Sequence, residues 1–160
     1  MLAVKLIFVG KMREKYFSDA FAEYEKRLGA YCKLEISEIA EIRLAETPSE
    51  KEINSALARE AAEIEKQTPK GAYVVAMCVE GKKLGSTELA ELIAARAGAG
   101  VSKLCFIVGG SFGLHDSLKG IADLRLSMSD MTFPHHLARV MLAEQLYRAF
   151  SINEGARYHK

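Results

Sequence analysis

The chain has 160 residues and a net charge of +1 at neutral pH, with 49% hydrophobic and 27% charged residues. This length is typical of one domain with its own core, and the near-zero charge excludes a protein that binds nucleic acid over its whole surface. We therefore expect a single domain over residues 1–160, in which any nucleic-acid contact comes from a local patch.

The first half of the chain alternates strand and helix patterns. Residues 2–9 form an apolar run that ends at a glycine, which predicts a buried strand. Apolar residues at helical spacing follow over 16–28, and residues 33–39 alternate apolar and polar side chains as a strand does. The run Thr47-Pro48-Ser49-Glu50 predicts a helix start, with Thr47 as the cap and Pro48 at the first helical position.

The second half continues the alternation, and most of its strand-like runs are apolar on both sides. Such strands, separated by helices, are typical of a parallel sheet with helices on both faces, so the sequence predicts the α/β class. The expected elements are a strand over 73–79, a helix from 86 that Gly98 and Gly100 stop, a strand over 104–108, a short helix over 116–120, a strand over 124–128 and a helix over 134–152.

The cysteines and the apolar runs indicate the cellular compartment. Cys32, Cys78 and Cys105 each lie in an apolar run without a CxxC motif, so we interpret them as buried hydrophobic residues in a reducing compartment. The apolar start is short and lacks a basic segment and a cleavage site, and no run approaches membrane-spanning length. We expect a cytoplasmic protein with no membrane segment and no metal.

Two loops stand where a ligand crevice is expected. Gly109-Gly110-Ser111-Phe112-Gly113 follows the strand over 104–108, and residues 127–136 precede the last helix. Glycine lets backbone approach a ligand closely, a helix start has free N–H groups, and loops at one end of a parallel sheet form a crevice. The spacing GGxxG after the fourth strand does not match a dinucleotide fingerprint. The glycine loop is therefore either a ligand loop or a plain turn.

The last helix and the residues after it hold three ambiguous features. Arg139 falls on an apolar face with Leu142 and Leu146, so it is either ion-paired or part of a site or interface. The wide apolar coverage of this helix predicts a homodimer that uses it. The tail Tyr158-His159-Lys160 is either frayed and inert or suited to stacking and phosphate contact. Adjacent His135-His136 fits a helix entry better than a metal site.

Long motifs in the last third resemble those of the ribosomal large subunit methyltransferase H family, a SPOUT-class group of enzymes. The resemblance spans the whole chain, including Val9-Gly10-Lys11 after the first strand and Glu80-Gly81-Lys82 after the third. The motifs that carry it are Phe106-Ile107-Val108-Gly109-Gly110-Ser111-Phe112-Gly113-Leu114, Ser127-Met128-Ser129-Asp130-Met131-Thr132-Phe133-Pro134-His135, Leu137-Ala138-Arg139-Val140-Met141-Leu142-Ala143-Glu144-Gln145-Leu146-Tyr147-Arg148-Ala149, and terminal Tyr158-His159.

The resemblance implies a C-terminal trefoil knot, an obligate homodimer and methylation of N3 of a pseudouridine in 23S rRNA, with S-adenosylmethionine as cofactor and the assembled ribosome as the expected substrate. For this reaction the side chains of the last third offer His159 as a candidate base, and Arg139 and Lys160 as candidate stabilisers or phosphate ligands. The expected RNA contacts are Tyr158, His159, Lys160 and Arg139. The implied cofactor contacts are Met77, Gly109, Gly110, Met128, Ser129, Asp130, Met131, Thr132, Phe133 and Pro134.

Two other functions are alternatives to this one. An oxidoreductase that binds a nicotinamide or flavin dinucleotide is disfavoured by the misplaced glycines and by the lack of a fitting acid after the first strand. An RNA-binding or assembly factor without enzymatic activity would not need an apolar cofactor pocket. Binding of S-adenosylmethionine, NAD and FAD to the pure protein separates the three.

Overall fold

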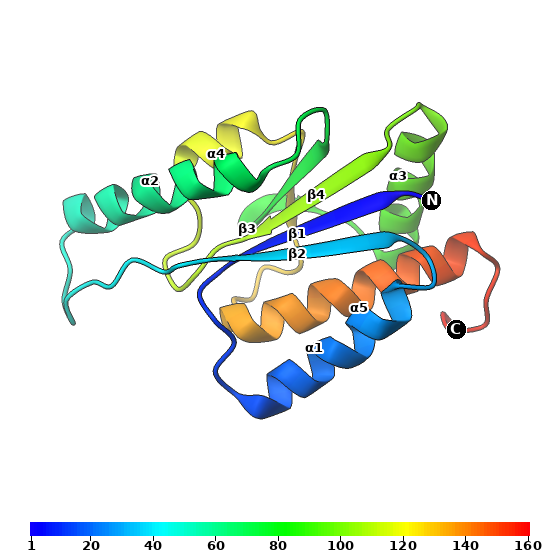
Figure 1. The fold of residues 1–160 in the computed structure, drawn as a ribbon, viewed down its shortest axis with the longest axis horizontal. Coiled ribbons are helices and arrows are strands. Elements are labelled where there is room, and N and C mark those ends of the chain that lie inside the picture. Colours follow the sequence, from blue (N-terminus) through cyan, green and yellow to red (C-terminus); the bar gives the residue numbers. More distant parts are fainter.

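The computed structural model of the chain describes residues 1–160, in which five strands alternate with five helices (Figure 1). The strands pair in the order β2-β1-β4-β3-β5, and every pair is parallel. The predicted α/β class is confirmed. The elements are β1 (Ala3–Val9), α1 (Lys15–Leu28), β2 (Lys33–Ile39), α2 (Glu50–Gln67), β3 (Tyr73–Lys83), α3 (Ser86–Gly98), β4 (Lys103–Val108), α4 (Asp116–Ile121), β5 (Leu124–Ser127) and α5 (His135–Asn153).

The sheet is covered on both faces, as predicted. Side chains of a strand alternate between faces, so Leu6 and Phe8 of β1 join one core cluster while Ile7 and Val9 join the other. The first cluster contains residues of α1, α3 and α5, and the second contains residues of α2 and α4. Figure 1 shows α2 and α4 on one side of the sheet and α1 with α5 on the other.

Helix α2 begins two residues later than the sequence predicts. Ser49, not Thr47, is the N-cap: its hydroxyl accepts from the backbone N–H of Glu52, and the Glu52 carboxylate accepts from the N–H of Ser49. Pro48 lies outside the helix. The S-x-x-E capping box supplies two hydrogen bonds that a cap at Thr47 would lack, so it determines where the helix starts.

Strand β3 is longer than predicted, and its pairing with β5 is irregular. Met77 and Lys82 both pair with Leu126, so residues 78–81 form an excursion from the ladder. Gly81 closes this excursion against β5, where a Cβ would lie 2.7 Å from the backbone carbon of Arg125. Residues 78–80 of the excursion line the cavity described below.

Helix α5 buries the predicted apolar face inside its own chain. Leu142, Ala143 and Leu146 are at most 1% exposed and pack in the first core cluster, while α5 contacts both α1 and α3. The argument that this face needs a second subunit is therefore wrong, because one chain already covers it. The homodimer stays a proposal and needs another basis. The trefoil knot likewise stays a prediction.

Candidate active site

A cavity of about 580 Å³ opens at the carboxyl edge of the sheet. Its walls are the excursion of β3, the glycine loop after β4, the segment after β5 and the first turn of α5. Half of its 22 lining residues are hydrophobic. Size, place and lining are those of a small-molecule site on a parallel α/β sheet.

The two predicted loops meet at this cavity. All of the predicted cofactor residues except Asp130 line it, and Asp130 is directed away, with its carboxylate 2.6 Å from Lys83 Nζ. Its side chain is 82% exposed. The residues that line the cavity as predicted are Met77, Gly109, Gly110, Met128, Ser129, Met131, Thr132, Phe133 and Pro134.

The glycine loop folds back tightly on itself. Gly113 N donates to Gly110 O at 3.1 Å, and Gly113 has a φ of +78°, which favours glycine. A Cβ on Gly109 would lie 2.4 Å from Gly113 O, whereas one on Gly110 would meet the Glu41 carboxylate at 2.9 Å. The loop therefore needs glycine at 109 for the turn itself. The structural-turn alternative is therefore observed, while the ligand-binding role of the loop stays a prediction.

Hydroxyl groups hold the second loop against the cavity. Ser127 Oγ donates to Ser129 O at 2.9 Å, and Ser129 Oγ accepts from Met131 N at 3.0 Å. Short polar side chains that bond neighbouring backbone fix an irregular segment without a helix or a strand. The backbone from Ser129 to Pro134 is thereby held as a cavity wall.

Sequence reasoning missed an ion pair in the cavity wall. Lys119 of α4 and Glu80 of β3 lie 2.5 Å apart, Nζ to Oε1. The hydrogen bond from Lys119 holds the pKa of the Glu80 carboxyl below its usual range, so Glu80 is charged at neutral pH. No group of three or more His, Cys, Asp or Glu side chains is placed to hold a metal ion.

His135 also lines the cavity, although its sequence context indicated only a helix entry. Burial, and secondly the neighbouring His136, lowers the pKa of its imidazole, so the ring is neutral at pH 7. His136 instead bonds Glu14 at 2.9 Å across to α1. Burial in the folded chain, rather than any motif, is the main reason for this neutral state of His135.

Arg139 is 1% exposed, which matches the ion-paired alternative. Its guanidinium donates to Val9 O at 2.5 Å, Gly10 O at 2.7 Å and Glu38 at 3.1 Å. It also lies 4.8 Å from the ring centroid of Phe8. These bonds tie the start of α5 to the ends of β1 and β2. As placed, the guanidinium does not reach the surface where RNA could contact it.

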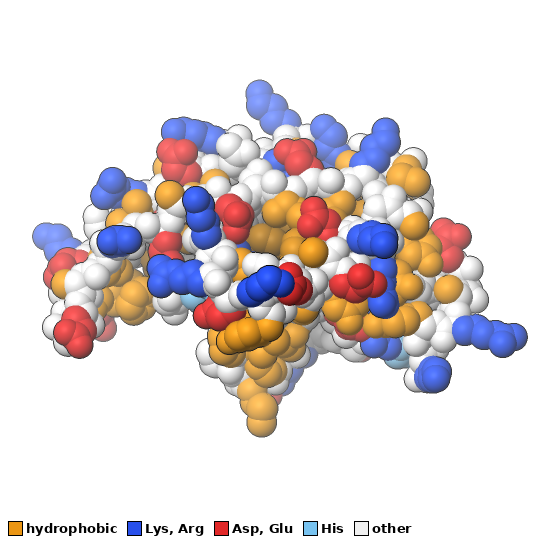
Figure 2. All heavy atoms as spheres, turned by 60° about the horizontal axis from the view of Figure 1, so that its bottom comes forward, with side chains coloured by type: hydrophobic (Ala, Val, Ile, Leu, Met, Phe, Trp, Pro, Cys, Tyr) orange, Lys and Arg blue, Asp and Glu red, His pale blue; other side chains and the backbone are white.

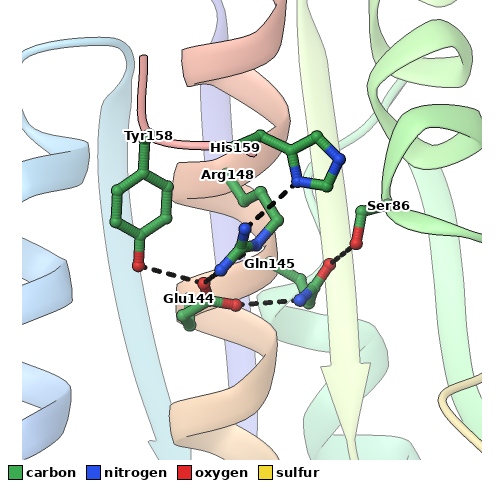
Figure 3. A network of polar contacts seen from close by, with 6 residues as sticks. All are labelled: Ser86, Glu144, Gln145, Arg148, Tyr158 and His159. Carbon is green, nitrogen blue, oxygen red and sulfur yellow. Dashed lines mark hydrogen bonds and ion pairs between the residues drawn. The ribbon is translucent and has the colours of Figure 1, made fainter. Parts of the chain in front are cut away.

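The C-terminal tail docks on α5 and does not reach the cavity of its own chain. Tyr158 donates to Glu144 at 3.0 Å, and Arg148 contacts both the Tyr158 ring and His159 Nδ1 (Figure 3). No residue from 157 to 160 lines the cavity. The tail lies near the opposite end of α5 from the cavity wall (Figure 1). It is held by specific contacts rather than frayed.

A family model described as a predicted SPOUT methyltransferase matches residues 2–159. The chain belongs to this family. It is 46% identical to the ribosomal RNA large subunit methyltransferase H of Bifidobacterium adolescentis, over 99% of this chain and 100% of that protein. It is 45% identical to the protein of that name in Clostridioides difficile, over 98% of this chain and 99% of that one.

Solved structures share the SPOUT methyltransferase fold with this chain at low identity. A probable methylase family protein from Haemophilus influenzae matches with a TM-score of 0.62 at 13% identity, over 100% of this chain and 72% of that one. A probable methyltransferase from Bordetella pertussis matches with a TM-score of 0.58 at 14% identity, over 93% and 96% of the two chains. At this identity they support the fold alone.

The cavity of this SPOUT methyltransferase fits S-adenosylmethionine in size and chemistry. The apolar walls suit an adenosine ring system, and the glycine loop brings backbone to the cavity surface. Lys119 and Glu80 offer one charge of each sign, which suits an amino-acid group. No helix of the chain is both long and apolar enough to cross a membrane.

Proposed function

We propose that this SPOUT methyltransferase transfers a methyl group from S-adenosylmethionine to N3 of a pseudouridine in 23S rRNA. The observation that carries the proposal is the cavity, because the two long motifs that resemble methyltransferase H meet in it. The names of the 45–46% identical relatives support a ribosomal RNA substrate. We propose that residues 1–160 act as one catalytic domain, in the cytoplasm where ribosomes are made.

The chain's own contribution is to bind, orient and exclude water. S-adenosylmethionine, when bound, supplies an electrophilic methyl group on a sulfonium. Met77 and the segment from Met128 to Pro134, apart from Asp130, would enclose the adenosine. The backbone at Gly109 and Gly110 would approach it closely. Aligning the methyl carbon with N3 converts a bimolecular step into an effectively unimolecular one.

The N3 proton of the base must be removed, and two histidines can accept it. His159 is the candidate from the tail, and His135 is a neutral imidazole already in the cavity wall. Tyr158 is not a base, because burial and its hydrogen bonds raise the pKa of its phenol to about 12. It remains a hydrogen-bond donor.

A homodimer is proposed because the cavity has an apolar rim that one chain leaves open. Val79, Phe112 and Met131 all line the cavity, and they are 47%, 50% and 72% exposed. On the face that carries α1 and α5, apolar surface also lies between charges of both signs (Figure 2). We propose that the second subunit, in covering the rim, also places its own tail at this cavity. Each site would then combine the pocket of one chain with His159 of the other.

RNA contact is proposed through the tail and the shape of the dimer. From residue 135 to the C-terminus the cations are Arg139, Arg148, Arg157 and Lys160. Arg139 is paired with Glu38 and Arg148 with Glu144, so Arg157 and Lys160 are the cations of this segment without a carboxylate partner. So small a patch provides little phosphate affinity by itself. A folded ribosomal surface that matches the protein in shape is therefore the expected substrate, rather than naked RNA.

Methyl transfer to three substrates tests this function. Labelled S-adenosylmethionine is incubated with the protein and 70S ribosomes, isolated large subunits or naked 23S rRNA from cells that lack the modification, and the modified base is mapped. We expect one N3-methylated pseudouridine, with the whole ribosome as the best substrate. Binding of NAD or FAD without S-adenosylmethionine would instead indicate an oxidoreductase. Ribosome binding without any cofactor would indicate an assembly factor.

A further inference from the structure

Two charged side chains line the cavity, and they face each other. Among all the lining residues, Lys119 is the only lysine or arginine and Glu80 is the only aspartate or glutamate. They come from different elements, α4 and the excursion of β3, and their charged atoms lie 2.5 Å apart. One isolated pair of opposite charges in an otherwise uncharged cavity is a feature that the loop motifs do not explain.

The surroundings make Lys119 the less replaceable member of the pair. Its side chain is 20% exposed, so its ammonium has lost most of its water and needs a counter-charge. Its only other carboxylate is Asp116, at 3.9 Å and 95% exposed. Glu80 is 55% exposed and can turn to water. Because the Glu80 carboxylate is more than half exposed, Glu80 itself has no need of Lys119, whereas Lys119 keeps its need of a counter-charge.

We propose that Lys119 and Glu80 bind the amino-acid end of the cofactor, and the inference rests on the proposed function. That end carries a carboxylate and an ammonium on one carbon. When it enters, Lys119 turns to the ligand carboxylate and Glu80 accepts from the ligand ammonium, so both protein charges stay paired. The free protein holds the two groups together, and the ligand separates them without leaving either unpaired.

Two probes that differ only at this end provide the test. S-adenosylhomocysteine carries the amino-acid group, whereas 5′-methylthioadenosine keeps the adenosine and sulfur but lacks it. Isothermal titration measures the affinity of each probe for the wild-type protein and for Lys119→Met. A charge-assisted hydrogen bond lost from the complex should weaken S-adenosylhomocysteine by about tenfold to a hundredfold. The affinity for 5′-methylthioadenosine should not change.

Lys83→Met is the matched control. Lys83 is also paired with a carboxylate, Asp130, near the same end of the sheet, but it does not line the cavity. The Lys83→Met substitution should leave the affinity for both probes unchanged. Lys119→Arg keeps the charge and should recover most of the lost affinity. If Lys119→Met fails to fold, Lys119→Gln takes its place, and unchanged 5′-methylthioadenosine binding shows that the pocket is intact.

Three results would overturn the inference. Equal binding of S-adenosylhomocysteine by Lys119→Met and the wild type would show that the carboxylate lies elsewhere. An equal loss for both probes would show that Lys119 supports the pocket rather than the amino-acid end. A wild-type protein that binds neither probe would overturn the proposed function too, whereas the first two results leave that function standing.

Discussion

Gly109 makes the tightest backbone contact in the cavity wall. A Cβ there would lie 2.4 Å from Gly113 O, so Gly109→Ala must open the glycine loop by a large fraction of an ångström or more. A misplacement of about 1 Å in an active site costs on the order of a hundredfold in rate, so we expect methyl transfer to fall by about that factor and the affinity for S-adenosylmethionine to fall as well. Gly98→Ala is the control, because a Cβ there has no neighbour within 4 Å. Unchanged affinity in folded Gly109→Ala would contradict this reading of the loop.

Arg139 offers a second test at the scale of one residue. Arg139→Met removes the donors to Val9 O and Gly10 O and leaves those carbonyls without this partner. Charge-assisted hydrogen bonds of this kind suggest a loss of about 3 kcal/mol in the free energy of unfolding, measured by urea denaturation. Arg157→Met, at an exposed position, should change it by less than about 0.5 kcal/mol. Equal stability of the two variants would show that the contacts of Arg139 do not stabilise the fold, and would favour a direct role with RNA.

Helix α2 shows how local motifs compete for a helix start. Ser49→Ala should destabilise the protein by about 1 kcal/mol, because it removes the hydroxyl that accepts from Glu52 N. Thr47→Ala should change little, since Thr47 lies before the cap. Thermal or urea unfolding of the two variants decides between the observed start and the one predicted from the sequence. A larger effect at Thr47 would favour the earlier start.

The elements themselves could be predicted from the sequence because their signals are local. The apolar runs of β1 and β4 and the helical spacing of α5 depend only on neighbours along the chain. The excursion of β3 could not, because Gly81 is needed only against the backbone of Arg125 on another strand. The same excursion places Glu80 in the cavity. The ion pair with Lys119 could therefore not be predicted from the sequence either, because it too depends on contacts between distant residues.

The site was predicted from long sequence motifs. Where the structure differs from that prediction, the difference is the direction in which a side chain points. Asp130 stands in a motif that lines the cavity, yet its carboxylate pairs with Lys83 outside it. The sequence does not decide whether Arg139 is ion-paired or part of a site, because its acceptors at the end of β1 lie far away in the sequence. Local patterns place a residue on an element, whereas long-range packing decides where its charged end goes.

At the scale of the whole molecule, the tail and the cavity of one chain lie apart. The tail bonds Glu144 and Arg148, which lie roughly 14–20 Å along the α5 axis from His135. If the site is composite, the tail works in the cavity of the other subunit. Deleting residues 158–160 should then abolish methylation of ribosomes without weakening cofactor binding. The loss of the Tyr158 contact should cost only about 1 kcal/mol of stability.

Subunit mixing tests whether the tail acts in the partner's site. One subunit lacks residues 158–160 and keeps its cavity, while the other carries Gly109→Ala and keeps its tail. Neither homodimer has a whole site, but in the heterodimer the intact cavity meets the intact tail across the interface. Each heterodimer should have about half the activity of the wild-type dimer, since one of two symmetric sites is whole. Random exchange at equal amounts makes about half of the dimers heterodimers, so the mixture should recover about a quarter of the wild-type activity. A tail that acted on its own chain would leave every mixture inactive. Full activity of the tail-deleted homodimer alone would show that the tail is inert.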